Sequence, residues 1–212
     1  MSAKEQYSRQ IALAKWINES LCGEFALNDQ TRLAFNCFDL AIEHHAAIFS
    51  LYSLELYGSM FALLRVQFEA CGKGLWLRHA ATEEDVKKYE RDDLNVGFGT
   101  LISIVEGKLG IESGALSKIK ANSWDIFCSF THTGYQSLVK RSNQTHTGNV
   151  NYHDDELASC LQLSGTFAML AAVELASISE NQEMISKALL HAKKYAENSS
   201  NNLLKPTPNG TV

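Results

Sequence analysis

The chain has 212 residues, of which 45% are hydrophobic and 20% charged, and its formal net charge at pH 7 is −5. This length suits one domain with a well-buried core and is short for two. The acidic balance argues against broad electrostatic attraction to nucleic acid. The five cysteines are widely spread and form no pair at metal-ligand spacing, so we expect reduced thiols in a cytoplasmic protein.

Both prolines of the chain, Pro206 and Pro208, lie close to its C-terminal end. A chain without proline at turns and strand edges, but with long apolar patterns of helical period, is typical of an almost entirely helical protein. We therefore predict an all-α fold, a single-domain antiparallel helical bundle of about seven helices. The bundle should occupy residues 1–198, and the polar segment 199–212 should form a flexible C-terminal tail.

Three long helices are expected in the first part of the chain, at about residues 2–21, 29–52 and 56–79. The third is apolar on nearly every side and should be central. Because Arg65, Glu69 and Lys73 interrupt its apolar stretch, we do not expect it to span a membrane. The second and third helices have more apolar surface than one neighbour can cover, which predicts a homodimer.

The second part of the chain begins with a charged helical segment at residues 82–93. An apolar segment follows, and its glycines predict a break near Gly97. Residues 110–122 should form a loop with one short helix, and residues 141–152, which are polar and turn-rich, a long loop. Helices are expected at residues 94–109, 123–140, 154–178 and 181–198.

The third helix carries two charged side chains, Arg65 and Glu69, one helical turn apart within a stripe of small residues. The stripe also contains Gly58, Ala62 and Gly72. Small residues allow another helix to approach closely, so the Arg65–Glu69 pair should be largely buried. An internal salt bridge that only fixes the helix register is the alternative interpretation.

A second polar stripe, on the helix expected after Ser123, contains Asp125, Ser129, His132 and Gln136 at helical spacing. Opposed to Arg65 and Glu69, it would form a small polar pocket between helices. We predict a ligand-binding site there, in which Arg65 holds a small anionic ligand. Its residues would be Arg65, Glu69, Ser129, His132 and Gln136. An oriented His132 could also act as a general base or acid; a hydrogen-bonded core histidine is the simpler alternative.

Acidic and histidine side chains also cluster in the second helix, at Asp39, Glu43, His44 and His45. Two consecutive residues of a helix point about 100° apart, so one metal ion would rarely receive both histidines. The chain also has no Glu-x-x-His pair of the kind that builds di-iron bundles. We expect no metal site and no cofactor.

Two segments carry a resemblance to known proteins. Residues 65–77 (RVQFEACGKGLWL) and 124–136 (WDIFCSFTHTGYQ), followed by Arg141, resemble a group of uncharacterised bacterial all-helical proteins. The resemblance covers about residues 56–156. It implies membership and an all-helical fold, and it implies no particular activity.

A looser resemblance is to the HEPN superfamily of helical RNases and nucleotide-binding proteins, whose motif is an Arg followed after four to six residues by a His. Arg141 and His146 have that spacing, although Ser142 stands where the family usually has Asn, Asp or His. The resemblance implies a metal-independent RNase working across a dimer interface, with His146 as general base and Arg141 stabilising the phosphoryl charge. We thus expect a ligand-binding or interaction module, with an RNase of a defence or toxin type, acting on RNA, as the alternative.

Overall fold

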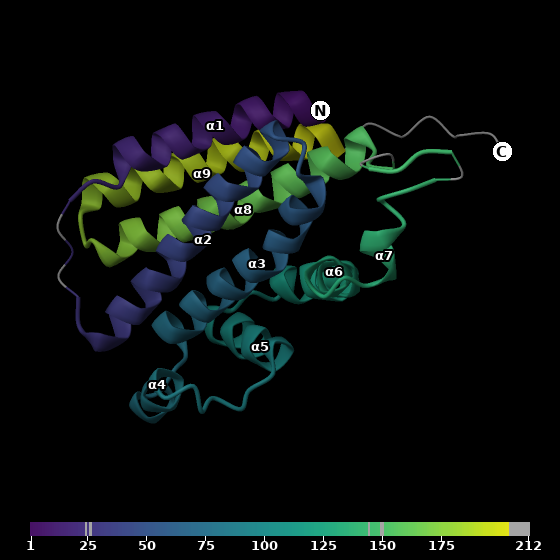
Figure 1. Ribbon diagram of the computed structural model, residues 1–212. Helices are drawn as coiled ribbons and strands as arrows, with labels where there is room; N and C mark the ends of the chain where they lie inside the picture. Colours follow the sequence, from purple (N-terminus) through teal and green to yellow (C-terminus); the bar gives the residue numbers. More distant parts are fainter. Residues whose placement is uncertain (24, 26, 144, 149–150, 204–212) are drawn as a thin grey trace.

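The computed structural model describes residues 1–203, apart from residues 24, 26, 144, 149 and 150 (Figure 1). Within these residues the regular structure is helical, with one isolated bridge between Ser142 and Thr147. The helices are α1 (Ala3–Ser20), α2 (Asp29–Ser53), α3 (Tyr57–His79), α4 (Glu83–Glu90), α5 (Phe98–Leu109), α6 (Ala115–Thr131), α7 (Tyr135–Leu138), α8 (Asp154–Ile178) and α9 (Gln182–Leu203). The all-α prediction is confirmed, with nine helices in the described part instead of about seven.

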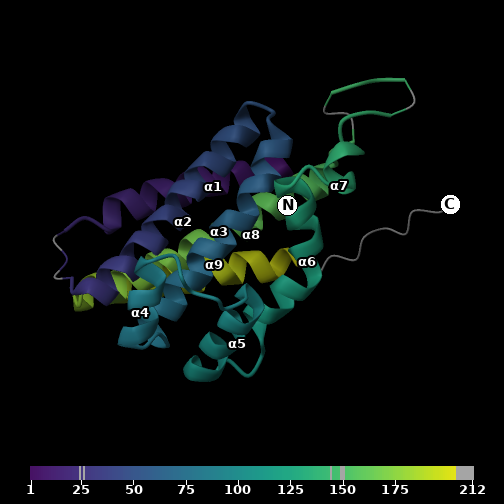
Figure 2. The same ribbon diagram turned by 60° about the horizontal axis from the view of Figure 1, so that its bottom comes forward.

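The central position expected for the third helix is confirmed by α3, which packs against α2, α5, α6 and α8. Helices α1 and α9 lie on one side of α2, α3 and α8, and the shorter helices α4, α5 and α6 lie on the other (Figure 1). Figure 2 turns the side with α4 and α5 toward the viewer. The apolar surface of α3 is therefore covered within the chain. It no longer argues for a homodimer, which stays a prediction.

Helix α8 forms the other half of the core. It is the one helix in the described residues whose length and apolar composition would suffice to cross a membrane. However, 61% of its most apolar window is buried inside the protein, against the neighbouring helices. Such burial is typical of a core helix, which passes the same compositional test as a membrane span.

Local capping explains where several helices begin. The Ser2, Asn28 and Thr82 side chains each accept a hydrogen bond from the backbone N–H three residues later, at the starts of α1, α2 and α4. The break predicted near Gly97 is confirmed, since Gly97 is the residue before α5. Helix α5 ends at Leu109, and Gly110 follows it with a φ of 64°, in the left-handed region that favours glycine.

The helix predicted for residues 123–140 is wrong at both ends. Helix α6 already begins at Ala115, because the Glu106 carboxylate of α5 accepts hydrogen bonds from the backbone N–H groups of Leu116 (2.7 Å) and Ser117 (3.1 Å). It ends at Thr131, and two residues later Thr133 has a positive φ of 57°, which a right-handed helix does not allow. The cap from α5 is a tertiary contact, so no local pattern in the sequence predicted it.

At the C-terminal end, α9 continues to Leu203 and so includes the first residues of the segment expected to be a tail. The remainder of that predicted tail, residues 204–212, lies outside the described residues. The predicted loop after α7 is confirmed, since the described residues between Leu138 and Asp154 are outside the helices.

A layer of buried polar side chains crosses the bundle, and we call it the polar layer. Its members, each at most 8% exposed, are Gln6, Gln10, His45, Gln67, Ser164 and Tyr195. His45 Nδ1 lies 3.1 Å from Ser164 Oγ, and Gln67 Nε2 donates to the backbone carbonyls of Ala41 (3.1 Å) and Ser164 (3.0 Å). Tyr195 donates to Gln10 Oε1 over 3.3 Å. The layer joins α1, α2, α3, α8 and α9.

Candidate functional site

The predicted pairing of Arg65 with Glu69 and His132 is present in the structure. Arg65 Nε donates to Glu69 Oε1 over 2.9 Å, and Arg65 Nη1 donates to His132 Nε2. The guanidinium carbon lies 4.9 Å from the centroid of the Trp124 ring, within range of a cation–π interaction. With side-chain exposures of 20% for Arg65 and 24% for Glu69, the pair is partly buried.

The contact with Arg65 determines what His132 can do. An arginine guanidinium only donates hydrogen bonds, so Nε2 of His132 is the acceptor in this contact. His132 is the first residue after α6, and its side chain is exposed. Its Nε2 lone pair is already used, and in this arrangement Nε2 cannot remove a proton from a substrate.

A cleft of about 370 Å³ opens beside Arg65, between α3, α4, α5 and the middle of α6. We call it the Arg65 cleft. Its polar lining residues are Arg65, Glu69, Lys73, Tyr89 and Asp92. Its apolar wall includes Phe98, Leu101 and Trp124.

The charges in the Arg65 cleft balance, with two cations and two carboxylates, but they are not equally paired. Arg65 and Glu69 bind each other. The side chains of Lys73 and Asp92 make no hydrogen bond or ion pair within the described residues. Burial, and then the neighbouring Cys37, raise the pKa of Tyr89, so its phenol is neutral near pH 7. The cleft can therefore offer a fixed guanidinium, an unpaired ammonium and an unpaired carboxylate to a ligand.

The apolar wall of the Arg65 cleft is built from two stacked rings. The Trp124 and Phe98 rings are 5.2 Å apart and inclined by 21°, and Phe98 meets Phe68 edge-to-face. Phe98 can lie against α3 because residue 72 is glycine: a Cβ there would be 2.7 Å from the Phe98 ring. The small-residue stripe thus permits a close approach, as expected, and the approaching element is α5.

The other two residues predicted for the pocket lie elsewhere. Ser129 faces the turn after α6, where a Cβ at Gly134 would be 2.7 Å from its Oγ, and this Oγ is buried without a hydrogen-bond partner in the described chain. Gln136 is on α7 and lines a different cleft. Because α6 ends at Thr131, the predicted stripe does not continue along one helix and the five residues do not form one pocket.

Several residues of the Arg65 cleft were not among those predicted from the sequence. Lys73 follows Glu69 by four residues, as Glu69 follows Arg65, so the same helical spacing could have identified it. Tyr89, Asp92 and Phe98 come from the segment that folds over α3, and no local pattern placed them there. Trp124, in the middle of α6, completes the apolar wall.

The pair Arg141 and His146 lies in the loop between α7 and α8. Asn143 N donates to the carbonyl of His146 over 2.9 Å, and His146 N donates back to Asn143 Oδ1 over 2.8 Å. His146 Nδ1 is 2.7 Å from Thr145 Oγ1, and both Arg141 and His146 are exposed. The RNase role of this pair stays a prediction.

The second helix holds His44 and His45 apart, as their adjacent positions require. His45 points into the polar layer, where it meets Ser164, while His44 is only half-buried. No group of three His, Cys, Asp or Glu side chains converges within the described part of the chain.

Comparison with known proteins gives a family but no activity. No curated protein and no solved structure matches the chain. A family model matches residues 38–200, which include α3, α8 and every residue of the Arg65 cleft. Because this match covers well over half of the 212 residues, the chain belongs to a family of unknown function, DUF6988.

Proposed function

We propose that the protein binds a small aromatic or heteroaromatic carboxylate in the Arg65 cleft. The observation that carries the proposal is the position of the Arg65 guanidinium. Glu69 and His132 hold it at the side of the cleft, next to the face of Trp124. A planar, fixed guanidinium is suited to a carboxylate, which it can meet with two parallel hydrogen bonds.

The remaining lining residues narrow the ligand class. Lys73 can reach the same carboxylate as a second, flexible cation. The stacked rings of Trp124 and Phe98 offer a flat apolar surface for the ring of a ligand. The unpaired Asp92 carboxylate of the cleft can accept a hydrogen bond from an amino or hydroxyl group of the ligand. An aromatic acid with one hydrogen-bond donor satisfies all three features.

Binding without turnover is the activity that this arrangement supports best. A hydrolytic site needs a nucleophile or an activated water next to a free base. His132, beside the cleft, uses Nε2 to accept from Arg65, and the Tyr89 phenol is neutral with a raised pKa. The Asp92 carboxylate is unpaired, but within the described residues no hydroxyl, thiol or amine is hydrogen-bonded to it as a nucleophile. The RNase alternative, with Arg141 and His146, rests on their spacing alone.

Isothermal titration with indole-3-acetate and its neutral amide, indole-3-acetamide, tests the proposal. The acid should bind more tightly than the amide, and Lys73→Gln should weaken the acid by about fivefold to tenfold, since it removes one charge-assisted contact. The matched control is Lys118→Gln, which removes an exposed lysine of α6 that does not line the cleft. Equal affinities for acid and amide, or equal losses in the two variants, would contradict the proposal.

A further inference from the structure

A second cleft, which takes no part in the proposed function, lies on another face of α3 and α6. It has a volume of about 340 Å³ and opens between α3, α6, α7 and the first turns of α8. We call it the Phe127 cleft. Its most buried lining residues are Leu64, Phe127, Phe130 and Cys160, each at most 9% exposed. An apolar interior of this kind, with a few polar groups at its opening, is typical of small-molecule sites.

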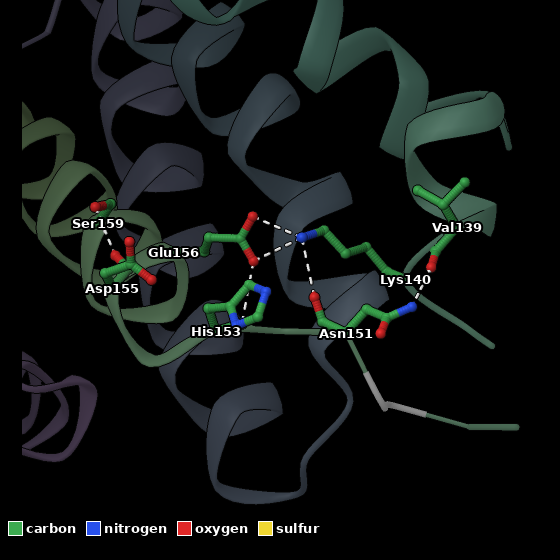
Figure 3. Close-up of polar contacts among 7 residues, drawn as sticks. All are labelled: Val139, Lys140, Asn151, His153, Asp155, Glu156 and Ser159. Atoms are coloured by element: carbon green, nitrogen blue, oxygen red, sulfur yellow. Dashed lines mark hydrogen bonds and ion pairs between the residues drawn. The ribbon is translucent and has the colours of Figure 1, made fainter. Parts of the chain in front are cut away.

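Two of the three charged groups at the opening are bound to each other. Lys140 Nζ lies 2.6 Å and 2.7 Å from the two carboxylate oxygens of Glu156, and it also donates to the Asn151 carbonyl over 3.0 Å (Figure 3). Glu156 Oε2 accepts a further hydrogen bond from the backbone of His153. The Lys140–Glu156 pair is thus electrically balanced and has its hydrogen bonds satisfied.

The third charged group, Asp155, is not bound in this way. In Figure 3 Lys140 reaches Glu156 and not Asp155, and the Ser159 hydroxyl donates to the backbone carbonyl of Asp155 instead of its carboxylate. The Asp155 carboxylate makes no hydrogen bond or ion pair within the described residues. Ser123 and Gln136 complete the polar rim with a hydroxyl and an amide.

We propose that the Phe127 cleft binds a small amine with an apolar body, such as an arylalkylamine. The body would lie against Phe127 and Phe130, and the ammonium would meet the Asp155 carboxylate. Charge complementarity selects a cation, because the balance of the rim is one negative charge and its unpaired member is a carboxylate. The volume is near the lower end of the range of about 300–1,000 Å³ for ligand pockets, so one ring with a short chain would fill the cleft.

The test compares three probes that share a body and differ in the head group: 2-phenylethylamine, 2-phenylethanol and 3-phenylpropionate. Binding is followed by amide chemical-shift changes in the full chain. We expect the order amine, alcohol, acid, with the amine at least about fivefold tighter than the alcohol, since only the amine forms a charge-assisted contact. The shifts should centre on residues around Phe127 and Asp155.

Asp155→Asn should remove the preference for the amine and leave the affinity for 2-phenylethanol unchanged. The matched control, Asp125→Asn, removes an exposed carboxylate of α6 outside the cleft and should keep the preference. An amine that binds no tighter than the alcohol, or a preference that survives in Asp155→Asn, would overturn the proposal. Absence of saturable amine binding would do the same. Because Asp155 does not line the Arg65 cleft, the titration with indole-3-acetate distinguishes failure here from failure there.

Discussion

Acid should destabilise the protein through one histidine of the polar layer. His45 is 1% exposed and lies next to the Ser164 hydroxyl and the edge of Phe49. Burial lowers the pKa of His45 from 6.5 to about 4, and the nearby Gln10 backbone opposes this by a smaller amount. In the unfolded chain the same ring should titrate near its ordinary value.

The sign and size of the effect follow from these two pKa values. Between them the unfolded chain binds a proton on His45 and the folded chain does not, so the free energy of unfolding falls as the pH is lowered from about 6.5 to about 4. A difference of about 2.5 units corresponds to at most about 3.4 kcal/mol, of which about 2 kcal/mol is already lost at pH 5. Above pH 7 the His45 ring is neutral in both the folded and the unfolded chain, so it causes no further change of the free energy of unfolding with pH.

Urea denaturation at pH 8, 6, 5 and 4.5 measures this loss, with His45→Gln as the test variant. Partial burial also lowers the pKa values of His44 and His191, so they contribute to the wild-type slope. The difference between wild type and His45→Gln isolates His45, and it should shrink by about 2 kcal/mol from pH 8 to pH 5. His146→Gln, in the exposed loop, should keep the wild-type slope. A His45→Gln slope equal to that of the wild type would refute the assignment.

Further changes have equally direct expectations. Arg65→Ala should lower the free energy of unfolding by about 2 kcal/mol in urea titrations, because it leaves the Glu69 carboxylate without its partner. The double variant Arg65→Ala, Glu69→Ala should lose less, because no unpaired carboxylate remains; a larger loss in the double variant would contradict this. Gly165→Ala should cost about 2 kcal/mol, since its Cβ would collide with the Gln10–Tyr195 contact, whereas Gly107→Ala, with nothing within 4 Å, should gain about 0.5–1 kcal/mol; thermal melts of both would show the opposite signs. The wild-type protein should not cleave single-stranded RNA in the presence of EDTA, because its net charge of −5 disfavours RNA binding. Cleavage by the wild type that is lost in His146→Ala would support the RNase alternative.

The sequence was sufficient to predict which segments form helices, because the features that favour a helix are local. The absence of proline before residue 206, the capping residues and the apolar periodicity all act over a few residues. The start of α6 was not predictable in this way, because its first N–H groups are capped by Glu106 from another helix. Its end depends on a positive φ at Thr133, a residue type that rarely signals one.

The candidate site was half predictable for the same reason. Arg65 and Glu69 share a helix face, and His132 was expected to oppose them, so spacing on two helices sufficed. Gln136 was placed wrongly because the spacing assumed one continuous helix through residue 134. Asp92 and Phe98 enter the Arg65 cleft through the path of the segment between α4 and α5, which only tertiary packing determines.

The polar layer also limits the ways in which these helices can pack. Two apolar helix faces can slide past each other at a small cost in packing free energy, because one methyl group then takes the place of another. A slip of one helical turn, about 5.4 Å, would instead separate His45 from Ser164 and Gln67 from its two carbonyls, and each would remain buried without a partner. Five helices are thereby held in one alignment, so an all-apolar redesign of these six positions should yield a bundle that is harder to unfold yet conformationally heterogeneous.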